Sequence, residues 1–170
     1  MDEAKDFERV VDLHYASLYR FAFSLTRRES DACDLAQETF LLWARKGHQL
    51  REENKVKSWL FTTLYREFLQ KQRRVTRFPQ VEIDSAGAEL PDIPPPSIGR
   101  LDRQTVLEAL GQVEDRFQAV IALFYLEDYT HPEIAEILDI PVGTVKSRIS
   151  RGIAQLQRIL QDVRTEARHA

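Results

Sequence analysis

The sequence predicts an all-α protein in which a proline-rich acidic linker joins two small helical domains. Apolar residues recur at helical spacing through most of residues 5–77 and again through most of residues 101–160. The stretch between them, residues 79–99, contains five of the seven prolines and no Lys or Arg, and it shows little periodicity. We therefore expect one domain in residues 1–78, the linker in residues 79–99 and a second domain in residues 100–170.

Length and composition fit this arrangement. A chain of 170 residues suffices for one domain or two small ones, and 43% hydrophobic residues is ordinary for a globular protein. A single cysteine, Cys33, excludes an internal disulfide and suits a reducing cytoplasm. The acidic N-terminus lacks the apolar core of a signal peptide, and no run approaches the ~20 apolar residues of a membrane span. We expect a cytoplasmic protein without membrane insertion.

Charge is distributed unevenly along the chain. The net charge of −3 says nothing about nucleic acid by itself. Residues 51–78, however, carry eight Lys or Arg against three Asp or Glu, and residues 143–170 carry six against two. Two basic patches separated by an acidic strip indicate two contact sites for a polyanion. An extended linker would reach roughly 60 Å at ~3.1 Å per residue, nearly two turns of DNA at about 34–36 Å each.

Two helices are predicted before the first loop. The first, residues 5–27, buries a continuous apolar stripe that includes His14, which we interpret as a structural histidine. The second starts after a polar break, with Ser30 or Asp31 as its N-cap, and ends at Gly47. Its buried face consists of Ala32, Leu35, Ala36, Thr39, Phe40 and Trp43. Its other faces carry Asp34, Gln37, Glu38 and Leu41, where the acids are either a solvated edge or a contact surface for a protein partner.

A third helix is predicted over residues 55–77, after a polar, non-periodic loop at residues 47–54. Its core stripe consists of Val56, Trp59, Leu60, Thr63, Leu64 and Phe68. Aromatic side chains also stand among basic ones, namely Trp59, Phe61, Tyr65 and Phe68 with Lys57, Arg66, Lys71, Arg73, Arg74 and Arg77. This mixture fits either stacking of unpaired bases, with cations on phosphates, or a core tryptophan followed by a basic helix end that favours the helix dipole.

Residues 129–160 predict a helix-turn-helix on a core supplied by helical residues 101–127. A short first helix begins near Pro132 and breaks at Asp139, and a second helix opens with Pro141. The second helix buries Val145, Ile149, Gly152 and Leu156. Off that stripe lie Thr144, Lys146, Ser147, Arg148 and Arg151, which suits a helix lying in the major groove. An amphipathic helical hairpin with solvated charges is the alternative, and the chain's last residues are expected to fray.

Three segments follow one another in this chain: Asp34–Phe40 (DLAQETF), Trp59–Leu60 on a helix that ends in Arg73–Arg74, and Glu133–Arg148 (EIAEILDIPVGTVKSR). With a proline-rich acidic linker between them, they resemble the extracytoplasmic-function (ECF) group of sigma-70 RNA polymerase sigma factors. The resemblance covers about residues 7–160. It implies a promoter-melting helical module and a helix-turn-helix module in a protein that binds core RNA polymerase and directs it to particular promoters.

The resemblance also implies roles for individual positions. Core polymerase would be contacted by Asp34, Gln37 and Glu38. The −10 element would be read by His48, Gln49, Leu50, Arg51, Asn54, Lys57 and Arg66, and the −35 element by Thr144, Lys146, Ser147, Arg148 and Arg151. Core RNA polymerase, promoter DNA and an anti-sigma factor are the implied partners, and the acidic linker would enter the polymerase channel. Asp139 replaces the usual small residue of the turn, and Asp tolerates a left-handed backbone better than most residues.

Two other function classes fit parts of the sequence. A two-module DNA-binding transcriptional regulator without polymerase binding would use Arg148 and Arg151 but leave Asp34 and Glu38 without a role. A carboxylate-dependent nuclease could recruit only the acids beside the turn, and no His, Cys or Ser constellation supports a nucleophile or a metal. We therefore expect no catalytic residue, no metal and no cofactor.

Overall fold

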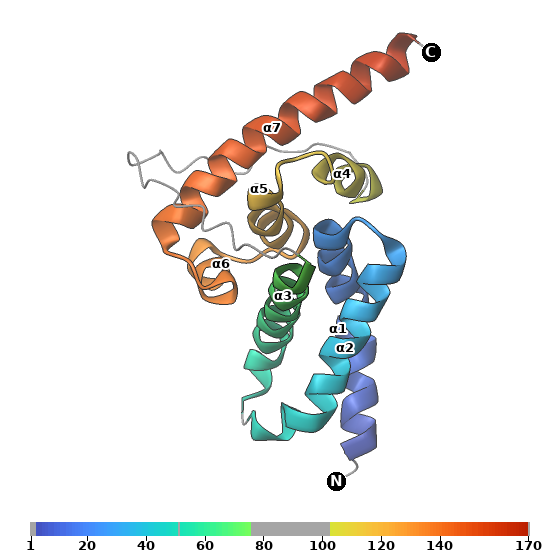
Figure 1. Ribbon diagram of the computed structural model, residues 1–170, viewed down its shortest axis with the longest axis vertical. Coiled ribbons are helices and arrows are strands. Elements are labelled where there is room, and N and C mark those ends of the chain that lie inside the picture. Colours follow the sequence, from blue (N-terminus) through green and yellow to red (C-terminus); the bar gives the residue numbers. More distant parts are fainter. Residues whose placement is uncertain (1–2, 51, 76–102, 170) are drawn as a thin grey trace. The chain divides into compact units, whose positions relative to one another are not determined.

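The described part of the chain folds almost entirely into helices, which confirms the all-α prediction (Figure 1). This computed structural model describes residues 3–50, 52–75 and 103–169, so the expected linker lies outside the described residues. The helices are α1 (Glu3–Thr26), α2 (Glu29–Lys46), α3 (Val56–Val75), α4 (Arg103–Leu110), α5 (Asp115–Ile121), α6 (His131–Leu138) and α7 (Val142–His169). They form two compact units, the first mainly from α1 to α3 and the second mainly from α4 to α7.

In the described part of the chain, three short turns of other helix types lie between these α-helices. Two single 3₁₀ turns, Gly47–Gln49 and Glu53–Lys55, lie between α2 and α3, where the sequence predicts a loop. A π-helical turn, Ala122–Leu126, continues α5. Such turns are short because their hydrogen-bond geometry is poorer than that of an α-helix.

The first unit forms because α1, α2 and α3 each bury one apolar stripe against the other two helices. The largest fully buried side chains here are Leu18, Phe21, Leu35, Leu60, Phe61 and Leu64. The rings of Phe21 and Phe61 have centroids 5.3 Å apart and join α1 to α3. Full burial of a side chain of this size contributes about 1.5–3 kcal/mol.

The burial of Phe61 corrects a prediction for α3. The sequence pattern places Phe61 among the aromatic side chains that could stack on unpaired bases. In the structure Phe61 is fully buried, so its ring is not accessible to a base. The buried side of α3 is wider than predicted because Phe61 lies directly after Leu60 and three residues before Leu64. Tyr65 and Phe68 are half-buried.

The start of α2 also differs from the prediction. The expected N-cap residues, Ser30 and Asp31, both lie inside the helix, which begins at Glu29. Arg28 occupies the N-cap position with an extended backbone and makes no side-chain capping hydrogen bond. The chain turns one residue earlier, at Arg27, whose φ of 58° is left-handed. Glu29 and Asp31 favour the positive end of the helix dipole, so charge stabilises a helix start that lacks a side-chain cap.

The second unit is centred on α5 and α7, and α4 also packs on α7. Its largest fully buried side chains are Leu110, Phe117, Ile121, Leu123, Ile134 and Leu156. The predicted stripe of α7 is confirmed, because Val145, Ile149, Gly152 and Leu156 are all buried. The helix continues to His169, and the fraying of its last residues stays a prediction.

Gly152 allows α7 to approach α5 closely. A Cβ at this position would overlap Cδ1 of Ile121 and lie 2.9 Å from Cβ of Phe117. Both neighbours are fully buried, so neither can move aside without disturbing the core. Glycine inside a helix costs roughly 0.5–1 kcal/mol relative to alanine, and the close packing at this point offsets that cost.

We predict that Gly152→Ala destabilises the second unit by about 1–3 kcal/mol, the usual cost of forcing an extra methyl group into a packed core. Thermal unfolding followed by circular dichroism measures the effect. Gly143→Ala in the same helix is the matched control, because nothing lies within 4 Å of a Cβ at that position. Its melting temperature should be unchanged or slightly higher. Equal melting temperatures for the two variants would show that the close contact is not required.

Candidate functional site

The helix-turn-helix expected from the sequence is present. A capping box formed by Thr130 and Glu133 closes the start of its first helix, α6. The backbone N–H and the hydroxyl of Thr130 donate to the Glu133 carboxylate at 2.8 and 2.7 Å. The Ile134 N–H donates to the Thr130 carbonyl at 2.9 Å and closes the first turn of α6. This arrangement fixes the residue at which α6 begins.

Asp139 makes the turn between the two helices, as expected. Its φ of 55° and ψ of 51° are left-handed, and its N–H donates to the Ala135 carbonyl. The Ile140 N–H donates to the same carbonyl at 3.1 Å, so the end of α6 is closed. The Val145 N–H then donates to the Pro141 carbonyl at 3.1 Å, at the start of α7.

The side of α7 opposite its buried stripe carries the residues expected to contact the −35 element. Lys146 and Arg151 are exposed, whereas Thr144, Ser147 and Arg148 are half-buried. The Ser147 hydroxyl donates to the Thr144 carbonyl at 3.1 Å, and Arg148 is engaged by other groups of the protein. Among the residues expected to contact the −35 element, Lys146 and Arg151 are therefore the ones that can reach a polyanion without rearrangement.

One basic residue on this side of α7 was not expected from the sequence. Arg158 is exposed and follows Arg151 by seven residues, which places it on the same helical face about 10 Å further along. Its Nε donates to the Ala154 carbonyl at 3.4 Å. The i, i+7 spacing was the signal that could have identified it.

A polar clamp holds α7 to the start of α5. The Oε1 atom of Gln155 accepts the Glu114 N–H at 3.1 Å, and Nε2 of Gln155 donates to the Glu114 carboxylate at 2.5 Å. Arg116 donates to the other oxygen of that carboxylate, through Nε at 2.8 Å and through its terminal nitrogen at 2.7 Å. No local pattern predicts this contact, because 41 residues separate its two ends.

The residues expected to read the −10 element lie between α2 and α3 and on α3. Gln49, Asn54 and Arg66 are exposed, and Leu50 and Lys57 are half-buried. Arg51 and the side chain of His48 lie outside the described residues. The Lys57 Nζ lies 5.9 Å from the centroid of the Phe61 ring. The two described cations of this set, Lys57 and Arg66, lie nine residues apart on α3.

His14 lies near this part of α3. Burial lowers its pKa from the usual value, and the charge of Lys57 lowers it further. His14 is therefore neutral at neutral pH, which fits the structural role that we expected for it. Its protonation in acid would oppose folding, because the folded state disfavours the charged form.

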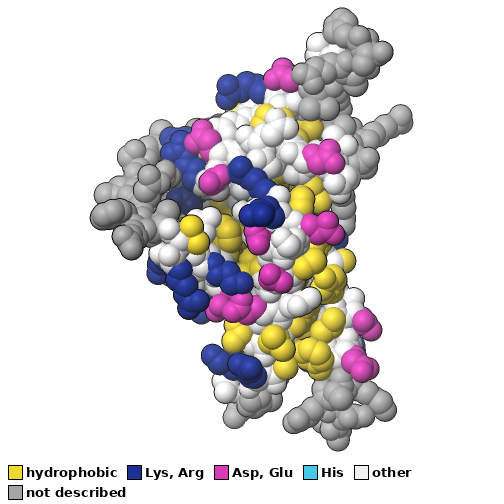
Figure 2. Space-filling view, turned by 45° about the vertical axis from the view of Figure 1, so that its right-hand side comes forward, with side chains coloured by type: hydrophobic (Ala, Val, Ile, Leu, Met, Phe, Trp, Pro, Cys, Tyr) yellow, Lys and Arg dark blue, Asp and Glu magenta, His cyan; other side chains and the backbone are white. Residues whose placement is uncertain are grey.

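The outer side of α2 carries the residues expected to contact polymerase. Asp34 and Gln37 are exposed. Glu38 is half-buried and forms an ion pair with Lys71 of α3, in which the Lys71 Nζ lies 2.6 Å from the Glu38 Oε2. Leu41, on the same side, leaves 58% of its surface exposed. Hydrophobic side chains also gather on the surface of the N-terminal helices in Figure 2, so acidic and apolar groups are available together.

Two other kinds of site, a metal centre and a membrane span, are absent from the part of the chain that the structure describes. No group of three or more His, Cys, Asp or Glu side chains there could hold a metal ion. No helix there is long and apolar enough to cross a membrane.

Comparison with known families assigns both units. The family model described as Sigma-70 region 2 matches residues 10–78, and the model described as Sigma-70, region 4 matches residues 103–156. The ECF RNA polymerase sigma factor SigL of Mycobacterium tuberculosis is 32% identical over 164 residues, which cover 95% of this chain and 92% of SigL. RNA polymerase sigma factor SigV of Bacillus subtilis is 32% identical over 86% of this chain and 85% of its own length.

Solved structures give the same assignment. The sigma factor RpoE of Bartonella quintana, in complex with the anti-sigma factor NepR, is 32% identical and superposes with a TM-score of 0.71. That alignment covers 92% of this chain and 98% of RpoE. CnrH in complex with the cytosolic domain of CnrY is 25% identical, with a TM-score of 0.62 over 94% of this chain and 90% of CnrH.

The left-handed turn gives a direct test of the helix-turn-helix geometry. We predict that Asp139→Val lowers stability by about 1–2 kcal/mol, because a β-branched residue opposes a left-handed backbone. Asp139→Gly should preserve or raise stability, because glycine adopts this conformation without strain. Urea unfolding of the two variants measures the difference. Equal stability of the two variants would contradict the left-handed assignment.

Proposed function

This chain belongs to the ECF group of sigma-70 RNA polymerase sigma factors, and from that membership we propose how its two units divide promoter recognition. As a sigma factor it binds core RNA polymerase and directs promoter-specific initiation. The first unit, residues 1–78, would hold polymerase and the −10 element, and the second, residues 100–170, would hold the −35 element. The linker of residues 79–99 would enter the polymerase channel, where its acidic side chains stand in for nucleic acid.

The exposed cations of α7 support the −35 assignment. The first residues of a recognition helix contact base edges, and Lys146 and Arg151 lie within the first three turns of α7. Charge on phosphates supplies affinity that weakens with salt. An Arg that reaches a guanine edge adds roughly 1–3 kcal/mol of discrimination. Thr144, Ser147 and Arg148 would complete this surface, and Arg158 would add a phosphate contact.

The loop between α2 and α3 would hold the separated −10 strand. Extruding a base costs a few kcal/mol, which stacking and contacts to the base must return. Gln49 and Asn54 offer hydrogen-bonding groups to a base edge, and Leu50 offers an apolar contact. Lys57 and Arg66 would hold phosphates of the same strand. His48 and Arg51, which belong to the same expected set, complete the proposal.

The outer side of α2 would be the polymerase contact. Asp34, Gln37 and Glu38 supply polar groups, and the exposed Leu41 adds an apolar side chain that a partner can bury. Lys71 pairs with the Oε2 atom of Glu38, so the other carboxylate oxygen takes no part in this ion pair. Protein interfaces commonly combine buried apolar contacts with a polar rim.

Regulation by an anti-sigma factor follows from the relatives. RpoE and CnrH were each solved with a bound partner, NepR in the first case and CnrY in the second. We propose that this chain is likewise held by an anti-sigma factor until a signal releases it. It would act in the cytoplasm, where polymerase and chromosomal DNA are.

The proposed roles require no enzymatic activity of the chain itself, because polymerase performs the chemistry. The proposed roles therefore give no support to the nuclease alternative. The regulator alternative, in which polymerase is never bound, leaves the Sigma-70 region 2 match over residues 10–78 unexplained. That match, together with the region 4 match, is the observation that carries the proposed function.

Transcription in vitro tests the proposal as a whole. Purified chain, added to bacterial core RNA polymerase on a pool of genomic fragments, should produce transcripts that start at defined sites. Sequencing of the transcript ends identifies the promoters, and core polymerase alone is the control. Absence of specific starts with inhibitor-free protein would contradict the proposed function.

The polymerase contact predicts different effects for two exposed leucines. Leu41→Ala should weaken binding to core polymerase about tenfold, since truncating an interface anchor costs about 1–2 kcal/mol or more. Leu13→Ala on α1 is the matched control, because Leu13 is 71% exposed and lies outside the proposed contact. Competition binding with labelled polymerase measures both variants, whose melting temperatures should match the wild type. Equal effects of the two substitutions would place the contact elsewhere.

The −35 assignment predicts a promoter-dependent effect for α7. Arg151→Ala should weaken holoenzyme binding by about 1–3 kcal/mol on a promoter recovered in the transcription assay. The effect should disappear when the −35 element of that promoter is replaced by random sequence. Arg45→Ala, which removes an exposed arginine from the first unit, should not distinguish the two promoters. A loss of the same size on both promoters would make Arg151 a non-specific contact.

A further inference from the structure

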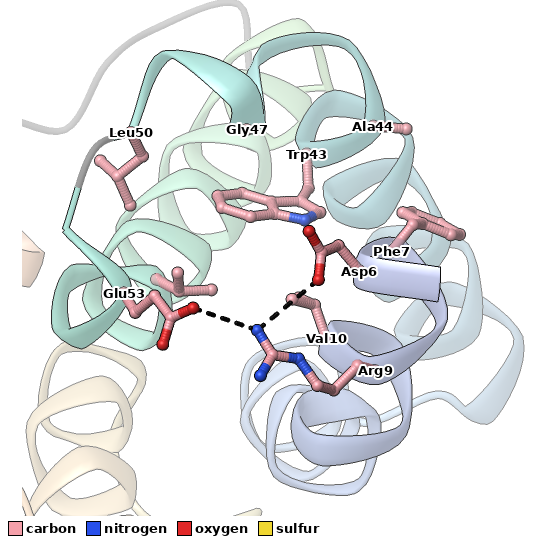
Figure 3. Close-up of a pocket in the computed structure, with 10 residues that line it drawn as sticks. Asp6, Phe7, Arg9, Val10, Trp43, Ala44, Gly47, Leu50 and Glu53 are labelled. Atoms are coloured by element: carbon pink, nitrogen blue, oxygen red, sulfur yellow. Dashed lines mark hydrogen bonds and ion pairs between the residues drawn. The ribbon is translucent and has the colours of Figure 1, made fainter. Parts of the chain in front are cut away.

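We infer that Trp43 and Gly47 form a positioning pair that sets the loop between α2 and α3, and thereby the proposed grip on the −10 strand. Neither residue belongs to the set expected to touch DNA. The inference rests on the proposed function of this loop. It is carried by the packing of one indole ring at both ends of the loop. Figure 3 shows the Trp43 ring beside Gly47, and the same ring packs on Trp59 of α3.

The backbone of Gly47 does not require a glycine. Its φ of −60° and ψ of −32° lie in the right-handed helical region, which every residue adopts readily. The Gly47 N–H donates to the Trp43 carbonyl, as in a continuing helix. α2 ends at Gly47, as expected from the sequence, but no left-handed backbone requires the glycine, so another constraint must explain why a glycine fits at this position.

That constraint is space for the indole of Trp43. A Cβ at position 47 would lie 2.6 Å from both Cδ2 and Cε2 of the Trp43 ring and 2.9 Å from Cε3. Real Cβ atoms do not approach ring carbons this closely, because the contact is strongly repulsive. The absence of a side chain at Gly47 thus lets the six-membered part of the indole lie against the first turn of the loop.

The same indole reaches the other end of the loop. Its ring packs edge-on against Trp59 of α3, with a centroid distance of 5.3 Å and an interplanar angle of 66°. Within the loop, the Leu50 N–H donates to the Gly47 carbonyl at 2.9 Å. A shift of the indole therefore moves the first turn of the loop and Leu50 with it.

A cavity beside the indole makes such a shift possible without unfolding. It is open to solvent on one side and has a volume of about 290 Å³. Phe7, Val10, Leu50 and Val56 line it together with Trp43, and Asp6, Arg9 and Glu53 add charged groups. At its rim Arg9 forms ion pairs with Glu53 at 3.2 Å and Asp6 at 3.8 Å, as Figure 3 shows. These exposed pairs contribute little to the stability of the loop, whereas the indole packs directly on it. An added methyl group at position 47 would displace the ring into the cavity.

Intrinsic fluorescence and strand binding together test the inference. The chain contains only two tryptophans, Trp43 and Trp59, so its emission reports this cluster directly. Gly47→Ala should shift the emission spectrum. Holoenzyme with this variant should bind a single-stranded oligonucleotide carrying a −10 element from the transcription assay about tenfold more weakly, the loss expected when one stacked base is misplaced. Its affinity for core polymerase should stay within twofold of the wild type.

A second variant separates positioning from general loss of structure. Trp43→Leu removes the ring that Gly47 accommodates, so adding Gly47→Ala to Trp43→Leu should cause no further loss of strand binding. The coupling between the two substitutions is the signature of the contact. Gln49 is exposed and does not pack against the Trp43 ring. Gln49→Ala should therefore lower strand binding without changing the emission spectrum.

Three results would overturn the inference. In the first, Gly47→Ala leaves both emission and strand binding unchanged. In the second, it lowers strand binding equally in the presence and absence of the Trp43 ring. In the third, it lowers polymerase affinity as much as strand binding, which indicates misfolding. If wild-type holoenzyme itself does not prefer the −10 oligonucleotide to a scrambled one, the proposed function of the loop fails, and the positioning role fails with it.

Discussion

The close packing of α7 on α5 is the contact on which the second unit depends. Gly152 lets the two helices meet at a distance that no larger residue permits, and the clamp of Gln155 on Glu114 fixes the next turn. A helix fixed along one side can present the other side in only one orientation. Since the left-handed turn at Asp139 fixes where α7 begins, the position of Lys146 and Arg151 on the surface follows from contacts that lie entirely inside the unit.

Sequence periodicity predicts those parts of the fold that depend on neighbouring residues. The buried stripe of α7, the turn at Asp139 and the three N-terminal helices all follow from spacing and turn chemistry. The errors have two origins, one a contact between distant residues and the other a local turn. Phe61 is buried because Phe21 lies opposite it, and nothing within α3 reveals that neighbour. Ser30 does not cap α2 because the turn at Arg27 lets the helix start earlier.

The exposure of the candidate contact residues was predictable to a similar degree. Residues that leave a buried stripe, such as Asp34, Lys146 and Arg151, are exposed where the pattern placed them. The sequence could not show which polar side chains are paired with other groups of the protein. The pairing of Glu38 with Lys71 joins two helices, and it could be found only once their packing was known. Residue type and spacing locate a surface, whereas tertiary contacts decide which of its side chains are available to a partner.

The two proposed DNA contacts differ in the physical demand they place on the protein. A duplex is a preformed partner, so a rigid helix with exposed cations gains affinity from charge alone. An unpaired base must first be extruded at a cost of a few kcal/mol, and only accurate contacts return that free energy. Among its described residues, the loop that would make those contacts is held by two short 3₁₀ turns and by exposed ion pairs, which contribute little. Its accuracy must therefore come from packing, and the indole of Trp43, seated where Gly47 has no side chain, is the group that supplies it.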